Sequence, residues 1–360
     1  MDGLYIGVMS GTSLDGVDIA LCEINSTQCT LLHSHEYIFP KELQEEILYL
    51  IANPTTLAQV GSLDVRLGNL FAASINAFVE KNEIDTNKIT AIGLHGQTLW
   101  HSPDTEFPFS MQLGCPNVVR AQTGMSVVAD FRSMDIANGG QGAPFAPAFH
   151  EFLFSNVKEK AAVINIGGMA NISILGEELK GWDIGVGNVL LDSWIKECKY
   201  FPYDHNGEFA QSGEVHEALL ENFLSDPYFQ LSPPKSTGRE YFNWDWLRSH
   251  TKNFQNVPQE DIQRTLLELT AQTITDTLRN TDISLLIICG GGAKNSFLMQ
   301  RLEELFLGKV QKSDAFNVSS DYMEAMAFAW LAYKRIHKEE VHLSSVTGAK
   351  KNSILGGIYG

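Results

Sequence analysis

Short apolar runs, some alternating with polar residues, predict strands at the start of the chain. Residues 17–21 alternate with a period of two, and turn-forming residues at 10–16 separate them from an earlier apolar run. Further along, apolar residues recur at helical spacing before two more strand-like runs appear. The predicted strands of this region are 4–8, 17–21, 29–32, 89–94 and 126–129, and the predicted helices are 41–52 and 56–81.

A second arrangement of strand, glycine turn and strand begins in the middle of the chain. The apolar run 162–166 leads into Gly167 and Gly168, and the run 171–175 follows. This repeats the layout of the N-terminus, with Gly167 in the place of Gly7, although the identity between the halves is low. We therefore predict two halves of similar topology.

The rest of the second half alternates helical patterns with one buried strand. Apolar residues over 262–278 follow the spacing of one helix face. The apolar run 284–289 predicts a buried strand that ends in three consecutive glycines. Helices are expected at 294–307 and 321–335, and the glycine-rich tail 346–360 is expected to be irregular.

Length and charge narrow the class of protein. The chain has 360 residues, which at roughly 150 residues per domain favours two domains. Its 43 acidic and 26 basic residues give a net charge of -17, which argues against a nucleic-acid or anionic-membrane partner. No apolar run approaches a membrane span, and no signal peptide is recognisable, so we expect a cytoplasmic protein. Five scattered cysteines without a CxxC motif indicate neither a zinc site nor a disulfide framework.

The familiar nucleotide motifs are missing, yet glycine turns recur at strand ends. There is no GxxxxGK[ST], and the glycines at 290–292 lack the third glycine of a dinucleotide fingerprint, because Asn295 stands there. A single glycine turn more often reverses the chain than binds phosphate. Two facing turns, however, can offer backbone N–H groups to a polyphosphate.

Eight short motifs follow one another along the chain. They are GVMSGTSLDGVD at 7–18, HGQT at 95–98, DFR at 130–132, GGQGAP at 139–144, NIGG at 165–168, PKSTGRE at 234–240, GGGA at 290–293 and EA at 324–325. This ordered set resembles the anhydro-N-acetylmuramic acid kinases, a bacterial branch of the superfamily of sugar kinases, heat-shock chaperones and actin. The resemblance extends nearly from end to end.

The resemblance implies an α/β fold of two actin-like domains, with mixed sheets, flanking helices and an interdomain cleft that binds ATP. We expect an N-terminal domain at 1–130, which the C-terminal tail can join, and a C-terminal domain with nucleotide-binding turns at 131–360. The family also implies Mg²⁺ as a cofactor and a homodimer as the assembly.

The implied reaction opens the 1,6-anhydro ring of 1,6-anhydro-N-acetylmuramic acid with water and phosphorylates O6. The products are N-acetylmuramic acid 6-phosphate and ADP, and the step belongs to cell-wall recycling. Two alternatives stay open. The chain could be a kinase for another amino sugar or a hexose, or an ATP-driven binding or chaperone-like module of the same superfamily.

Asp183 and Glu324 are the catalytic candidates that the resemblance implies. Asp183 would be the general base that activates the attacking water; the alternative is an Asx turn that caps a glycine loop. Glu324 would lie near the sugar and the water; the alternative is a capping box with Asp321. Ile184 and Val186 replace the usual Thr and Pro of this family, and we expect them to loosen the loop that presents Asp183.

The substrate-binding candidates surround two predicted strand ends. Arg132 follows the strand 126–129, and its guanidinium would suit the lactyl carboxylate of the sugar. A surface ion pair is the alternative for Arg132, and a structural role is the alternative for the histidines. The full set of substrate-binding candidates is His95, Gln97, Arg132, Gln141 and Gly142, with His101 lining the same pocket.

The candidates for ATP are the glycine turns. Asp15 and Asp18 could orient Mg²⁺ through waters, although Asp15 could equally shape its turn, and no direct metal ligand is predicted. Residues 235–239 form a basic, hydroxyl-rich patch for which we favour a place beside phosphate or at the domain interface, against a loop-capping role. The nucleotide-binding candidates are Gly11, Thr12, Ser13, Leu14, Asp15, Gly16, Val17, Asp18, Gly167, Gly168, Gly290, Gly291 and Gly292.

Overall fold

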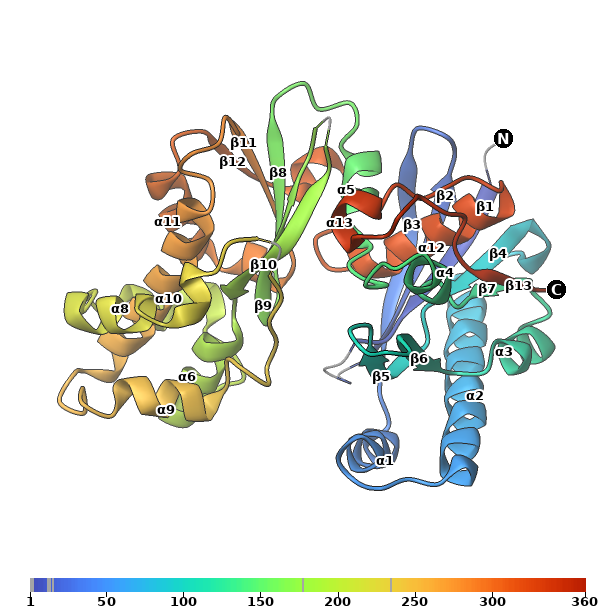
Figure 1. Cartoon of the computed structure of the whole chain (residues 1–360), viewed down its shortest axis with the longest axis horizontal. Coiled ribbons are helices and arrows are strands. Elements are labelled where there is room, and N and C mark those ends of the chain that lie inside the picture. The colour runs from blue at the N-terminus through green and yellow to red at the C-terminus, as the bar shows by residue number, and fades with distance from the viewer. Residues whose placement is uncertain (1–2, 12–13, 15, 177, 234) are drawn as a thin grey trace. The chain divides into compact units, whose positions relative to one another are not determined.

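The chain folds into two compact units (Figure 1). The computed structural model describes residues 3–11, 14, 16–176, 178–233 and 235–360. The first unit comprises the chain up to Ser155 together with Tyr322–Gly360, and the second comprises Asn156–Asp321. The boundary expected between residues 130 and 131 therefore falls inside the first unit, which also contains the C-terminal tail.

A six-stranded mixed sheet forms the centre of the first unit, beside a separate two-stranded hairpin. The strands are β1 (Gly3–Met9), β2 (Gly16–Ile24), β3 (Cys29–Ile38), β4 (Ile89–Leu94), β5 (Gln97–Ser102), β6 (Phe109–Leu113), β7 (Val127–Ala129) and β13 (Gly357–Tyr359). The order in the sheet is β13-β7-β4-β1-β2-β3, and β5 pairs with β6. Strands β1, β4 and β7 are parallel, whereas β2, β3 and β13 each run antiparallel to their neighbours.

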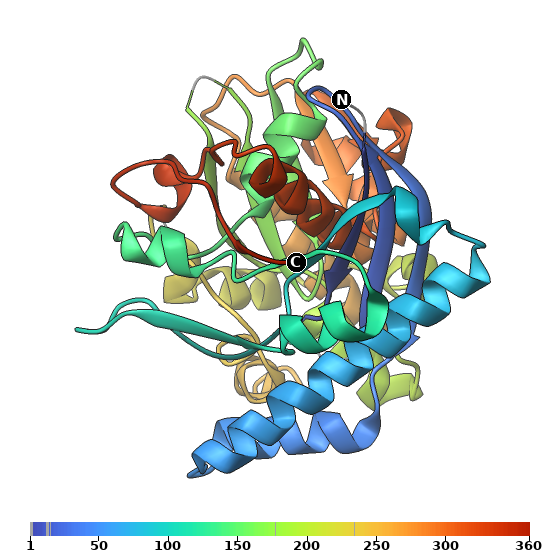
Figure 2. The same cartoon turned by 90° about the vertical axis from the view of Figure 1, so that its right-hand side faces the viewer.

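Helices surround this sheet. They are α1 (Lys41–Ala52), α2 (Leu57–Lys81), α3 (Pro116–Thr123), α4 (Ser133–Ala137), α5 (Ala146–Leu153), α12 (Met323–Ile336) and α13 (Ser344–Thr347). The long blue helix in Figure 2 is α2, which begins at a capping box between Thr56 and Gln59. Its buried residues recur every three or four positions, as expected of a helix with one face on the core.

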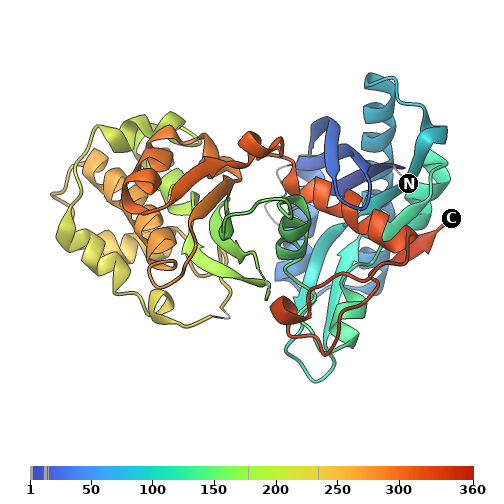
Figure 3. The same ribbon diagram turned by 90° about the horizontal axis from the view of Figure 1, so that it is seen from above.

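Two strand glycines let α12 pack directly on the sheet. A Cβ atom on Gly7 would lie 1.8 Å from the backbone oxygen of Ala325, and one on Gly93 would lie 1.9 Å from that of Phe328. Figure 3 shows α12, in red-orange, crossing the strands of this unit. This close packing is why the chain from Tyr322 onward belongs to the first unit. Gly7 is thus a packing glycine inside β1 and does not correspond to the turn glycine Gly167.

The second unit repeats the topology of the first. Its strands are β8 (Ala161–Ile166), β9 (Met169–Ile174), β10 (Lys180–Val186), β11 (Leu285–Cys289) and β12 (Lys309–Lys312), in the order β10-β9-β8-β11-β12. Strand β8 is antiparallel to β9 and parallel to β11, as β1 is antiparallel to β2 and parallel to β4. The predicted duplication is therefore confirmed at the level of strand order and direction.

The helices of the second unit include one that is largely buried, α10. They are α6 (Val189–Lys199), α7 (Glu208–Gln211), α8 (Glu217–Leu224), α9 (Trp244–Thr251), α10 (Gln259–Asp276) and α11 (Ser296–Leu305). Within α10, the buried Glu268 accepts a hydrogen bond from Arg264 (2.7 Å) and two from Arg301 of α11 (2.9 and 3.0 Å). One carboxylate thus links two arginines and two helices.

The structure differs from the predicted elements in several places. The hairpin β5–β6 was not predicted, and the tail expected to be irregular contains β13, which pairs with β7. Helix α11 begins at Ser296, after a 3₁₀ turn at Gly291–Lys294. Asp183, expected on a loop, lies within β10 and pairs with Asn171 of β9.

Candidate active site

The glycine turns of the second unit gather at one end of its sheet. The turn after β8 accepts hydrogen bonds from the segment that follows β10: the Asn188 N–H donates to Gly167 O (2.8 Å) and the Val189 N–H to Gly168 O (3.1 Å). The turn after β11 lies beside them, because Asn188 Nδ2 is 3.7 Å from the place of a Cβ on Gly291. Three turns from separate parts of the sequence thus form one group.

These glycines differ in how much space there is for a side chain at each position. A Cβ on Gly290 would lie 2.3 Å from a side-chain oxygen of β8, and one on Gly292 would lie 2.4 Å from Ile166 Cγ2. A Cβ on Gly167 or Gly291 would meet nothing closer than 3.7 Å. Packing alone therefore explains Gly290 and Gly292, whereas Gly167 and Gly291 present open backbone that a ligand can approach.

Arg239 places a cation at the turn after β8. Its Nε and Nη2 atoms lie 3.5 and 3.6 Å from the place of a Cβ on Gly168. Its positive charge also opposes the effect of burial on Asp192 of α6, whose pKa burial raises to about 6. The sequence predicted Arg239 only as part of the basic patch at 235–239. A specific role for Arg239 could have been inferred because it is an arginine within a motif of an otherwise acidic chain.

Asp183 projects from β10 with one carboxylate oxygen held in place. Oδ2 accepts hydrogen bonds from Ser236 Oγ (2.9 Å) and the Thr237 N–H (3.0 Å). On the backbone, the Asp183 N–H donates to Lys235 O (3.1 Å), and the Tyr228 hydroxyl donates to Asp183 O (2.8 Å). Among the described residues nothing donates to Oδ1, so this oxygen is available to a ligand.

The surroundings of Asp183 act on its pKa in both directions. Burial raises the pKa, the hydrogen bonds from Thr237 and Ser236 oppose the rise, and the negative charge of Glu240 adds to it. These partners lie more than fifty positions away in the sequence. The alternative of an Asx turn is therefore wrong, because the carboxylate holds a distant segment.

Ile184 and Val186 belong to the core of the second unit. Both follow Asp183 in β10, and each is 1% exposed. The register of β10 against β9 shifts between Asp183 and Gly185. The expectation that Ile184 and Val186 loosen a loop is therefore wrong for this chain, since both side chains fill apolar space beneath a strand.

In the first unit, two motifs meet at the end of β1. The Ser10 hydroxyl donates to Gln97 Oε1 (2.6 Å), and Gln97 Nε2 donates to Gly11 O (3.3 Å). The His95 N–H donates to Val8 O (3.1 Å). The motif at 95–98 therefore supports the turn between β1 and β2.

That turn includes nucleotide-binding candidates that are only partly described. Thr12, Ser13 and Asp15 lie outside the described residues. Leu14 and Val17 are buried, with 3% and 0% of their surface exposed, so their side chains are part of the core. Any contact of these two residues with a nucleotide would have to come from the backbone.

Two further candidates of this turn are described. A Cβ on Gly16 would lie 2.5 Å from the carboxylate of Glu36 on β3, but Glu36 is exposed and the end of its side chain can move, so this contact does not require a glycine. Asp18, which lies opposite Met9 of β1, is only partly buried. Its carboxylate is therefore within reach of solvent near the turn.

Arg132 and His95 form a polar pair in the first unit. Arg132 Nη2 lies 3.0 Å from His95 Nε2, and because a guanidinium can only donate, His95 must accept and be neutral. Burial, reinforced by the charge of Arg132, lowers the pKa of His95 to about 3. Burial also lowers the pKa of Arg132 to about 10, against the effect of Glu324. At neutral pH the pair is one cation and one neutral imidazole.

Glu324 lies in the first turn of α12. The surrounding protein raises the pKa of its carboxyl, and the charge of Arg132 opposes the rise, although the side chain is open to water. The alternative of a capping box is not found: the residue before α12 is Tyr322, which makes no side-chain cap, and Asp321 pairs with Lys294 (2.8 Å). Glu324 therefore takes no part in a helix cap, and its carboxylate interacts electrostatically with Arg132.

The glycine-rich loop at 139–144 lies beside Arg132. A Cβ on Gly142 would lie 3.3 Å from Arg132 Cβ, and Gln141 Nε2 donates to Asp104 Oδ1 (2.8 Å). The first unit therefore brings together the sugar-binding candidates and Glu324, while the second unit brings Asp183 together with the glycine turns. Over the described residues, no group of three or more His, Cys, Asp or Glu side chains could hold a metal ion.

Comparison with known proteins identifies the family. A family model described as anhydro-N-acetylmuramic acid kinase matches residues 3–360. The chain belongs to the anhydro-N-acetylmuramic acid kinase family. It is 54% identical to the anhydro-N-acetylmuramic acid kinase of Sulfurimonas denitrificans, with 100% of both chains covered. It is 47% identical to that of Pasteurella multocida, with 99% of this chain and 96% of the relative covered.

A solved structure shows the same fold. Component A of (R)-2-hydroxyglutaryl-CoA dehydratase from Acidaminococcus fermentans is 13% identical, has a TM-score of 0.50, and covers 93% of this chain and 100% of its own. The predicted α/β class with mixed sheets and flanking helices is confirmed. Membership of the kinase family makes the chain an enzyme that uses ATP and acts on a sugar. In the part of the chain that is described, no helix is long and apolar enough to cross a membrane.

A buried aspartate of this kinase anchors the loop at 139–144. Asp135, which is 4% exposed, accepts hydrogen bonds from the Gly142 N–H (2.7 Å) at Oδ2 and from Thr347 Oγ1 (2.8 Å) at Oδ1. The Gln141 N–H in turn donates to Thr347 O (2.9 Å). The C-terminal segment and α4 thus hold the loop from two sides.

Asp135→Ala should weaken sugar binding more than it slows turnover. The change leaves the buried Gly142 N–H without its acceptor, a cost of about 1–3 kcal/mol. It also removes one of two acceptors of the Thr347 hydroxyl, which can still donate to Leu343 O (3.1 Å). We expect the KM for the sugar to rise at least tenfold while the KM for ATP stays within about twofold. Steady-state kinetics with each substrate varied in turn measures both, and equal increases in the two KM values would contradict a role confined to this loop.

Proposed function

We propose that this kinase opens the 1,6-anhydro ring of 1,6-anhydro-N-acetylmuramic acid and transfers the γ-phosphoryl group of ATP to O6. The products are N-acetylmuramic acid 6-phosphate and ADP. The observation that carries the proposal is the state of the Asp183 carboxylate. One oxygen is fixed by Ser236 and Thr237, and the other accepts no hydrogen bond from the described residues.

Asp183 would act as the general base. Its free oxygen takes a proton from water as the water oxygen bonds to the anomeric carbon and the bond from that carbon to O6 breaks. The electron pair of that bond stays on O6, which attacks the γ-phosphorus, and ADP leaves. Positioned bases typically contribute 10²–10⁴-fold in rate, and a carboxylate whose pKa is raised by burial is a stronger base than a free one.

Arg132 would bind the acidic part of the sugar. Its pairing with a neutral His95 uses one of the five N–H donors and leaves the positive charge uncompensated by that partner. A guanidinium suits a carboxylate such as that of the lactyl group. Gln141 and Gly142, on the loop that Asp135 anchors, would contact the same sugar, with Glu324 near the attacking water.

ATP would bind at the glycine turns. Gly167 and Gly291 have open space where a side chain would stand, and Arg239 lies over the neighbouring Gly168, so phosphate can approach the backbone beside a cation. The Gly167 N–H itself already donates to Met169 O (3.0 Å), so the donors would come from the other residues of the turns. Bound Mg²⁺ would neutralise charge on the phosphates. The partly buried Asp18 fits such an ion through water, because Mg²⁺ keeps several waters and takes few protein ligands.

Ser236→Ala should shift the pH dependence of turnover. The hydroxyl stabilises the ionised form of Asp183, so removing it raises the pKa of that carboxyl further. A base must be ionised to act, and turnover is therefore lost as the pH falls through this pKa. We expect the acidic limb of the kcat profile to move to higher pH in the variant. An unchanged limb would mean that another group controls it.

Product analysis tests the proposed substrate. The enzyme is given ATP with 1,6-anhydro-N-acetylmuramic acid, N-acetylmuramic acid or glucose, and sugar phosphate is quantified. We expect the anhydro sugar to be used far more efficiently than the others. Preferred phosphorylation of glucose would favour a hexose kinase, in which the base deprotonates a sugar hydroxyl. We also propose that the enzyme is a cytoplasmic homodimer. Its reaction on the anhydro sugar would be a step of cell-wall recycling.

A further inference from the structure

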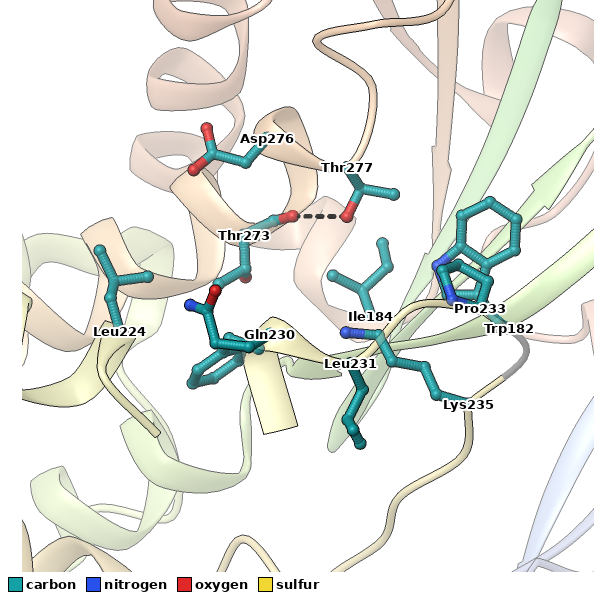
Figure 4. Close-up of a pocket in the computed structure, with 11 residues that line it drawn as sticks. Trp182, Ile184, Leu224, Gln230, Leu231, Pro233, Lys235, Thr273, Asp276 and Thr277 are labelled. Atoms are coloured by element: carbon teal, nitrogen blue, oxygen red, sulfur yellow. Dashed lines mark hydrogen bonds between the residues drawn. The ribbon is translucent and has the colours of Figure 1, made fainter. Parts of the chain in front are cut away.

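A cavity of about 440 Å³ lies in the second unit, beside the strand that carries Asp183 (Figure 4). Trp182 and Ile184 of β10 line it, whereas Asp183 between them does not. Successive side chains of a strand point to opposite faces. The cavity therefore lies on the face of β10 away from the Asp183 carboxylate, against the end of α10 at Thr273 and Thr277.

The cavity has an apolar wall and one accessible cation. Figure 4 shows the ammonium of Lys235 reaching between the apolar side chains of Leu231 and Ile184. The ammonium donates to Tyr228 O (3.2 Å) and lies 4.6 Å from the centre of the Tyr228 ring. No described carboxylate lies within ion-pair distance of it. Two of its three donors are therefore free for an anion.

This lining defines a class of ligand. The volume is in the range of small-molecule sites, and such sites combine apolar walls with a few polar groups that fix orientation. The acidic group at the rim, Asp276, is already paired with Arg279 (2.7 Å), so it does not compete for Lys235. A molecule with a flat apolar body and a single carboxylate matches both features.

The wall of the cavity continues into the residues that hold Asp183. Lys235 lines the cavity, its backbone oxygen accepts from the Asp183 N–H (3.1 Å), and the next two residues bind the carboxylate. A ligand that draws the Lys235 side chain toward itself acts on the same short segment. A ligand bound beside Lys235 would therefore lie next to the two residues, Ser236 and Thr237, that hold the Asp183 carboxylate.

We propose that this cavity is a regulatory site for a small aromatic monocarboxylate, whose binding alters how residues 235–237 hold Asp183. The site itself is independent of the proposed reaction. Its effect on turnover rests on Asp183 being the base. The two parts are therefore tested by separate measurements, and the ligand class by a matched pair of probes.

Binding is tested with 1-naphthoate and its neutral analogue 1-naphthamide. Calorimetric titrations use the full chain with the sugar and a non-hydrolysable ATP analogue present, so that the active site is filled. We expect naphthoate to bind at least tenfold more tightly than the amide, Lys235→Met to abolish that preference, and Leu231→Trp to weaken both probes at least tenfold by filling the cavity. Absence of saturable binding, or a preference that survives Lys235→Met, would overturn the site.

Coupling is tested by hydrogen exchange of the backbone at 235–237 with and without saturating naphthoate. We expect exchange of the Thr237 N–H to change severalfold in the wild type and not in Leu231→Trp, and kcat to change over the same naphthoate concentrations. Unchanged exchange would overturn the coupling. If instead the proposed reaction is wrong, the wild type will form no sugar phosphate even without naphthoate.

Discussion

Asp183→Asn should reduce kcat by roughly 10²–10⁴-fold, about 3–5 kcal/mol of transition-state stabilisation, with little change in ATP affinity. The amide oxygen can still accept from Ser236 Oγ and the Thr237 N–H, so the segment that these residues form should keep its place. The variant loses the proton acceptor, which the proposed reaction needs only as the ring opens. The deficit therefore belongs to the transition state.

Single-turnover rates and nucleotide binding should be measured on the same preparation of this variant. Ser236→Ala is the matched control, because it removes one hydrogen bond to the carboxylate and keeps the base. We expect that control to lose less than tenfold at its pH optimum. Near wild-type turnover by Asp183→Asn would make Asp183 a structural residue, and Glu324 would become the candidate base.

Glu268→Gln should destabilise the second unit by about 3–5 kcal/mol at neutral pH, since removing one member of a buried ion pair leaves uncompensated charge. The side chains of Glu268 and Arg264 are 4% and 11% exposed, and Arg301 binds the same carboxylate through two N–H groups. Hydrogen bonds from both arginines lower the pKa of Glu268 despite burial. The stability that they provide is present above the pKa of the unfolded chain and is lost as the pH falls through the folded value.

Urea unfolding of wild type and variant at neutral and acidic pH measures this effect. The difference between them should shrink as the pH falls below the usual carboxyl range, about pH 4. Glu304→Gln is the control, because Glu304 pairs with the same Arg301 from the surface, and we expect a much smaller loss. Equal losses for the two variants would show that burial of the carboxylate is not the cause.

Periodicity predicted the elements whose burial pattern is simple. The helix at 41–52 and the strand at 89–94 are confirmed at both ends, and 56–81 matches α2 to within one residue. In each, apolar residues repeat with one period between clear boundaries. The hairpin β5–β6 was missed because each strand has only one buried residue, Gln97 in β5 and Leu113 in β6, so no buried face marks them.

Glycines misled the prediction wherever their role is packing. Gly185 and Gly187 made the segment around Asp183 resemble a loop, although Gly185 lies within β10. Gly7 is needed where α12 crosses β1, and Gly292 where the turn meets β8. A sequence does not say whether a missing Cβ makes room for a ligand or for another part of the chain.

The candidate site could be predicted as a set of motifs but not as a set of contacts. Resemblance singled out Asp183 and the patch at 235–239, yet nothing in the sequence pairs them, because more than fifty residues separate them. The same holds for Asp135 and Thr347, which are more than two hundred residues apart. Such contacts depend on the tertiary fold, which brings segments together that are far apart in the sequence.

The most direct test of the proposed reaction is to supply ATP and 1,6-anhydro-N-acetylmuramic acid in ¹⁸O-labelled water and to analyse the product by mass spectrometry. If water attacks the anomeric carbon while O6 takes the phosphoryl group, the sugar phosphate carries one ¹⁸O at the anomeric hydroxyl and none on phosphorus. The wild type should form this product, and Asp183→Asn should form it far more slowly. Label on phosphorus, or phosphorylated sugar that retains the anhydro ring, would contradict the proposed reaction.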